Sequence, residues 1–173
     1  TSGPDMEWML PGSVKSRYGE ANPRSPDLIE PAHRVRPTSG IEFVSSRHFP
    51  PEVQGDFLIN NNIGFLGTKQ HQMAEDGTGY KAKWRQDLLV SSDGNFRPVD
   101  LEFAPDGSLY VSDARGPGLG RVVQVTPPSI LPFATGLDYT AGISLDGTGG
   151  LLVGNVDAGF AGLDEMLVHP GGQ

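Results

Sequence analysis

The stretch that decides the fold is residues 97–113, which read RPVDLEFAPDGSLYVSD. Apolar residues alternate with polar ones in its first half, at Val99, Leu101 and Phe103. This alternation is typical of a half-buried strand. The pair Asp106-Gly107 follows, and it favours a tight hairpin turn because glycine tolerates a positive φ. Since apolar residues resume at 109–111, the stretch predicts a strand, a turn and a second strand.

The same hairpin recurs along the chain. Residues 99–113 align without a gap to residues 141–155, at an offset of 42, and apolar positions match apolar positions throughout. After one inserted residue, 121–127 align to 164–170. An earlier segment aligns in weaker register, with Ile41 and Asn61 at the positions of Leu101 and Asp113. The chain therefore contains three related units.

A period near 42 residues with about four short strands per unit is typical of β-propeller blades. The alternative is a glycine-rich β-sandwich whose spacing matches by chance, and the ungapped repeat favours the propeller. We expect an all-β fold with about three four-stranded blades, part of a six-bladed propeller. The expected divisions are an irregular N-terminal arm at 1–37 and blades at 38–96, 97–138 and 139–173.

Composition excludes several classes of function. The 24 glycines and 15 prolines suit short strands joined by turns, and the net charge of −8 without a basic stripe disfavours nucleic acid as a partner. No run approaches the roughly 18 apolar residues of a membrane span. Because cysteine is absent, disulfides, thiolate metal sites and covalently attached haem are excluded for this sequence.

Three blades do not close a ring. Propellers have at least four blades, and six blades need roughly 250 residues at this period. We therefore expect that missing blades or another protein chain completes the propeller. An uncovered apolar sheet would otherwise be an association surface.

Several short segments resemble the six-bladed propellers of the glucose/sorbosone dehydrogenase type, and most closely the planctomycete-type "membrane-bound dehydrogenase" propeller domain. These segments are residues 37–43, 48–50, 55–59, 79–81 and 97–113. The resemblance implies a periplasmic or extracellular protein that uses pyrroloquinoline quinone and calcium to oxidise a sugar or related alcohol. One departure is clear: sorbosone-type members carry His, Trp and Arg after the strand that ends here at Asn60, and this chain reads NNNIGFLG at 60–67.

A quinone cofactor carries its own redox chemistry, so the protein must supply a cationic clamp and a base. Arg97, directly before a strand, is the predicted cofactor clamp, and its structural alternative is a salt bridge to Asp100 or to a neighbouring loop. His71 is the predicted base, with a purely structural histidine as its alternative.

Asp100 and Asp113, at strand ends, are the predicted calcium ligands. Their alternative role is to satisfy free backbone groups. Two functions remain open from the sequence: a quinone-dependent sugar dehydrogenase-like propeller, and a non-catalytic propeller module that binds or scaffolds a protein partner.

Overall fold

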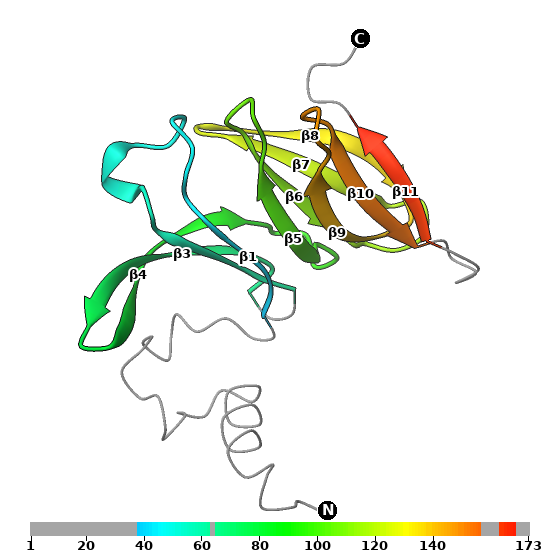
Figure 1. The fold of residues 1–173 in the computed structure, drawn as a ribbon. Coiled ribbons are helices and arrows are strands. Elements are labelled where there is room, and N and C mark those ends of the chain that lie inside the picture. The colour runs from blue at the N-terminus through cyan, green and yellow to red at the C-terminus, as the bar shows by residue number, and fades with distance from the viewer. Residues whose placement is uncertain (1–37, 63–64, 157–162, 169–173) are drawn as a thin grey trace, which may run out of the picture.

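The computed structural model describes residues 38–62, 65–156 and 163–168, and they form three antiparallel sheets (Figure 1). The first sheet contains β1 (Thr38–Phe43), β2 (Phe57–Asn61), β3 (Gly67–Asp76) and β4 (Gly79–Val90). The second contains β5 (Pro98–Phe103), β6 (Leu109–Asp113), β7 (Gly120–Thr126) and β8 (Ser129–Leu137). The third contains β9 (Tyr139–Leu145), β10 (Leu151–Val156) and β11 (Leu163–Val168). Strands follow one another in sequence order across each sheet.

The predicted repeat is confirmed in the strand register. Leu101 pairs with Val111 and Phe103 with Leu109 in the second sheet, and the third sheet pairs Ile143 with Val153 and Leu145 with Leu151. Each of these residues of the third sheet lies 42 positions after its counterpart in the second sheet. The first sheet repeats the pattern with Ile41 opposite Ile59 and Phe43 opposite Phe57. The first strand of each sheet also carries a bulge or irregularity in the same region.

The turn at Asp106-Gly107 also follows the sequence prediction. Gly107 has φ +82° and donates its backbone N–H to the carbonyl of Ala104 at 2.8 Å. Asp106 Oδ1 accepts the backbone N–H of Ser108 at 2.9 Å. This bond from a side chain to the backbone stabilises the turn. The predicted N-terminal arm at 1–37 lies outside the described residues.

The second sheet is packed on both faces, between the first and the third (Figure 1). One core joins the first two sheets, and its residues include Val44, Leu58, Leu89, Leu101, Leu109 and Val111. The other core joins the second and third sheets, and its residues include Tyr110, Val122, Ile143, Leu151 and Val153. The first strands β1, β5 and β9 lie beside one another in this order, with β5 in contact with both.

Candidate functional site

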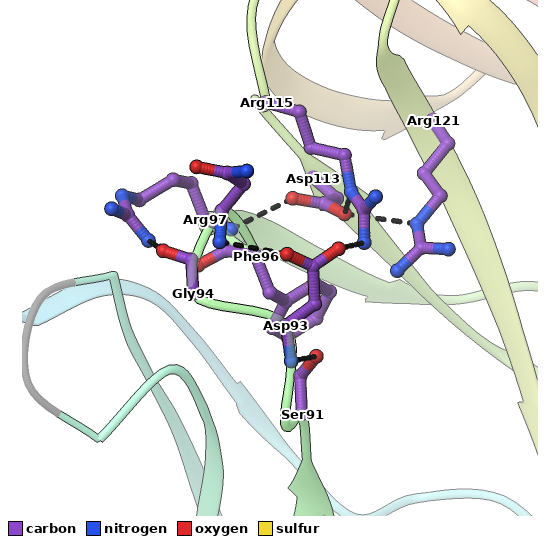
Figure 2. A network of polar contacts seen from close by, with 9 residues as sticks. Ser91, Asp93, Gly94, Phe96, Arg97, Asp113, Arg115 and Arg121 are labelled. Carbon is purple, nitrogen blue, oxygen red and sulfur yellow. Dashed lines mark hydrogen bonds and ion pairs between the residues drawn. The ribbon is translucent and has the colours of Figure 1, made fainter.

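A network of charged side chains gathers where the second sheet begins (Figure 2). Its members come from the loop before β5, the end of β6, the β6–β7 loop and the start of β7. We call it the arginine network: Asp93, Arg97, Asp113, Arg115 and Arg121. It contains two of the four residues predicted from the sequence as site residues, Arg97 and Asp113.

Asp113 is the centre of the arginine network. Its side chain is completely buried, and Oδ1 accepts the backbone N–H of Arg97 at 2.7 Å. Oδ2 accepts Nε of Arg115 at 2.6 Å and Nε of Arg121 at 2.9 Å. A buried carboxylate needs such partners because an unpaired charge in the interior is costly. These contacts agree with the structural alternative for Asp113, whose carboxylate ties the loop before β5 to β6 and β7.

Arg97 turns its guanidinium back onto its own loop. Nη1 donates to the carbonyl oxygen of Gly94 at 2.7 Å and to that of Phe96 at 2.9 Å (Figure 2). These bonds to carbonyl oxygens of its own loop differ from the structural alternative as well, which was a salt bridge to Asp100 or to a neighbouring loop. Among the arginines of the network, Arg97 is the one whose described contacts include no carboxylate.

The remaining carboxylate of the network, Asp93, stands at its rim. Its Oδ1 accepts the backbone N–H of Asn95 at 2.9 Å, and its Oδ2 lies 2.7 Å from Nη2 of Arg115. The hydrogen bond from Asn95, together with the charges of Arg115 and Arg121, holds the pKa of Asp93 below its usual value. Three cations and two carboxylates leave the network with one excess positive charge.

Asp100 joins the second sheet to the third. Its Oδ1 accepts the backbone N–H of Leu101 at 3.0 Å, and its Oδ2 accepts that of Ile143 at 2.9 Å. The neighbouring β1 approaches closely, since a Cβ added to Gly40 would lie 2.5 Å from Cα of Asp100. Both carboxylate oxygens thus hold backbone groups, in agreement with the structural alternative.

An acidic group lies near Asp100 on the first strands. Glu42 is on β1 and Glu102 on β5, and they occupy equivalent positions of the repeat. Burial, then the charge of Glu42 and that of Asp100, raises the pKa of Glu102. The carboxylates therefore repel one another where the first two sheets meet.

His71 lies inside the first sheet, away from the arginine network. It pairs with Phe57 on β2 and with Trp84 on β4, and its side chain is fully buried. Residues that face each other across antiparallel strands share a sheet face, so His71 belongs to an aromatic row. The structure does not bring His71 together with Arg97, Asp100 or Asp113 in one site.

The predicted calcium ligands do not fit a metal ion as they stand. In the part of the chain that the structure describes, no three His, Asp or Glu side chains are grouped so that they could hold a metal ion. The carboxylate oxygens of Asp100 and Asp113 already accept backbone or arginine N–H groups.

The sequence reasoning missed three members of the network: Asp93, Arg115 and Arg121. A signal was available. The repeat places Asn61, Asp113 and Asn155 at one position, and only the second unit has a charged residue there. An acidic residue at a strand-end position where its counterparts are neutral implies a cationic partner nearby.

Three sheets of this kind, each beginning at an inner strand that contacts the inner strand of the next, define a β-propeller arc. The sequence matches the family described as Domain of unknown function (DUF7133) over residues 9–115, more than half of the chain, and the chain belongs to this family. No curated protein matches it significantly. No helix among the described residues is long and apolar enough to cross a membrane.

A solved structure supports the propeller class. It belongs to a protein named as a candidate gluconolactonase and matches with a TM-score of 0.55 at 18% sequence identity, covering 84% of this chain and 49% of that one. This chain thus spans about half the length of the structure it matches. At this identity the likeness shows the fold alone, so the propeller is confirmed and the glucose/sorbosone dehydrogenase type stays a prediction.

Proposed function

We propose that the protein is a propeller module that works by association: its first sheet receives a further blade, and the completed ring forms the functional unit. The observation that carries the proposal is a difference in exposure between equivalent positions of the repeat. It concerns what we call the leading face of each blade, the face turned toward the preceding blade.

In the second and third blades the leading face is covered. Leu101, Leu109 and Val111 are at most 2% exposed because they pack on the first blade. Ile143, Leu151 and Val153 are at most 6% exposed because they pack on the second. The leading face is thus the surface by which one blade docks on another.

In the first blade the equivalent side chains are Ile41, Phe43, Phe57 and Ile59. They lie on the face opposite Leu58, which belongs to the core shared with the second blade, because side chains alternate along a strand. Ile41 is 56% exposed, whereas its counterparts Leu101 and Ile143 are buried. Phe43 is 50% exposed, whereas its counterparts Phe103 and Leu145 are half-buried, and Ile59 on the same face is 9% exposed. Ile41 and Phe43, more exposed than the same positions of the other two blades, support a docking surface for a blade.

The occupant we propose is a blade of the same repeat, supplied in a solution of this chain by a second copy. Two arcs of three blades would make a ring of six. The half-length coverage of the matching solved structure agrees with this arithmetic.

Sedimentation analysis tests the association. The chain should reach twice its mass of 18.5 kDa as its concentration rises, and the double variant Ile41→Ser/Phe43→Ser should remain monomeric. The matched control Ile130→Ser/Leu131→Ser removes two residues of β8 that are 49% and 57% exposed, and it should associate like the wild type. A wild-type chain that stays monomeric at high concentration would refute the docking of a second copy, as would a control that abolishes association.

The second candidate function is the quinone-dependent dehydrogenase, with its periplasmic or extracellular location. It is favoured by Arg97, whose described hydrogen bonds go to carbonyl oxygens and not to a carboxylate. Because the arginine network has one excess positive charge, this guanidinium is available to bind a carboxylate of the quinone. Adding pyrroloquinoline quinone and calcium should then change the cofactor's absorbance, and glucose should reduce a dye acceptor. No binding and no dye reduction would exclude this candidate for the isolated chain and leave the association test untouched.

A further inference from the structure

A cavity of about 520 Å³ opens at the end of the propeller arc opposite the arginine network. Residues from all three blades line it: Ser45, Ser46, Arg47 and His48 after β1, the turn from Phe103 to Gly107 after β5, and Leu145 at the end of β9. The arginine network precedes β5 in the chain, and this cavity follows β5. A pocket built jointly by three blades is a location where ligands commonly bind.

The cavity lining contains an arginine that has no carboxylate partner among the described residues. Arg47 and His48 are both exposed. Among the arginines in the described part of the chain, Arg47 is the one that makes no hydrogen bond or ion pair; the others bond to carboxylates or carbonyls. The protein as a whole carries a net charge of −8, so most of its surface repels anions. An unpaired arginine in a concave wall provides a local site that attracts them.

The carboxylate in the opposite wall is already committed. Asp106 Oδ1 accepts the backbone N–H of Ser108, and Oδ2 accepts the hydroxyl of Tyr110 at 2.8 Å and Nε2 of Gln124 at 3.3 Å. These three internal donors hold Asp106 in the hairpin turn. Asp106 therefore does not pair with Arg47, and the guanidinium of Arg47 is left for an external acceptor.

The segment that carries Arg47 and His48 is held in place on both sides. Ser46 Oγ donates to the carbonyl oxygen of Gly107 and accepts the backbone N–H of His48 at 3.1 Å. The His48 ring lies over Gly107, where an added Cβ would be 3.0 Å from Cε1. Phe49, directly after it, packs edge-on against Phe103 at 5.4 Å between ring centroids. A held segment loses little entropy when a ligand binds.

We propose that this cavity binds a small organic carboxylate with an apolar body. The carboxylate would meet the guanidinium of Arg47, which suits a two-oxygen acceptor, with the His48 ring beside it. The apolar body would lie against Phe103, Pro105 and Leu145. The site is independent of blade association and of the quinone.

Titration calorimetry and amide chemical-shift mapping with benzoate test the proposal. Benzoate should bind saturably and shift the amides of residues 45–48 and 103–107, and benzamide, which has the same ring without the charge, should bind at least about 10-fold more weakly. Arg47→Gln should weaken benzoate by a similar factor. Lys83→Gln, which removes an exposed positive charge on β4, should leave it unchanged.

A second variant separates a lost charge from a lost fold. Ser45→Trp places a large side chain at an exposed position of the cavity lining and should block benzoate while the amide spectrum elsewhere stays that of the wild type. Equal affinity for benzoate and benzamide would overturn the proposal. So would equal losses in Arg47→Gln and Lys83→Gln, or an absence of saturable binding.

Discussion

At the scale of single residues, one position of the repeat accepts backbone N–H groups of a loop in each blade, through an amide in the first and third blades and a carboxylate in the second. Asn61 accepts the backbone N–H groups of Phe65 and Leu66, and Asn155 accepts that of Asp138 at 2.9 Å. Asp113 accepts that of Arg97 and adds two arginine side chains. The shared function is to tie a loop to the end of a strand, and the charge in the second blade is an elaboration of it.

Removing that charge should destabilise the protein strongly. In Asp113→Asn the backbone bond to Arg97 can persist, but Arg115 and Arg121 lose a buried counter-ion, which typically costs about 3 kcal/mol. The control is Asp76→Asn, which breaks an ion pair with Lys81 whose side chains are about half exposed, and it should cost less than about 1 kcal/mol. Urea unfolding measures both free energies. Equal costs would show that the arginine network contributes no more than a surface pair.

A second residue-scale prediction concerns Glu102. Its raised pKa means that the folded state favours the protonated form, so the ionised carboxylate opposes folding at neutral pH. The free energy of unfolding of Glu102→Gln should therefore be larger than that of the wild type at pH 7. The difference should shrink as the pH falls through the raised pKa and below the ordinary value of 4.5, where the wild-type side chain becomes neutral too.

The control for Glu102 is Glu75→Gln, an exposed glutamate at the end of β3. Its unfolding free energy should follow the wild type across this pH range. A Glu102→Gln advantage that stays constant from pH 7 to pH 4 would contradict the assigned repulsion.

At the scale of elements, the hairpins could be predicted from the sequence, whereas the contacts of the site side chains could not. Alternation and the Asp-Gly turn fixed β5 and β6, and the offset of 42 carried the same register to β9 and β10. These patterns are local, because a strand's period and a turn's φ depend on neighbouring residues. They were therefore readable without knowing the fold.

The predicted site residues depended on contacts between distant segments. Oδ2 of Asp100 meets the N–H of Ile143, 43 residues away, and the direction of the Arg97 guanidinium depends on how its loop folds back. The position of His71 in an aromatic row depends on the pairing of β3 with both its neighbours. Residue type and strand-end position identified candidates, and long-range packing decided what each one touches.

The Asp-Gly turns allow a matched element-scale test. Gly77 and Gly107 both follow aspartate in a hairpin turn and have φ of +61° and +82°. An alanine at either position adopts a left-handed backbone at a cost of about 1 kcal/mol. Gly107→Ala also brings Cβ to 3.0 Å from Cε1 of the His48 ring, so the ring must shift by a few tenths of an ångström, whereas nothing lies within 4 Å of a Cβ at Gly77.

Gly107→Ala should therefore lower the free energy of unfolding by about 1 kcal/mol more than Gly77→Ala does. Thermal or urea unfolding of the two variants checks the difference. Equal losses would mean that the His48 segment yields freely, which would also weaken the case for a cavity wall held in place.

At the scale of the whole molecule, the arc has one fully enclosed blade. Every residue of β6 is buried, from Leu109 to Asp113, because sheets cover both faces of the second blade. The first blade packs on one neighbour, and Ile41 and Phe43 of its leading face are exposed. The far end of its β3–β4 hairpin is also exposed. Protection from solvent should therefore be unequal along the chain.

Hydrogen exchange at low protein concentration should follow this order. Amides of β6 should exchange at least about 100-fold more slowly than those at the β3–β4 turn, since exchange there requires only local opening. At concentrations where two copies associate, protection should increase in β1 and β2, which carry the leading face, and stay constant in β6. Faster exchange in β6 than in β2 at low concentration would contradict the enclosed position of the second blade. Association that protects β8 instead of β1 would place the contact on the outer edge of the arc and refute docking through the leading face.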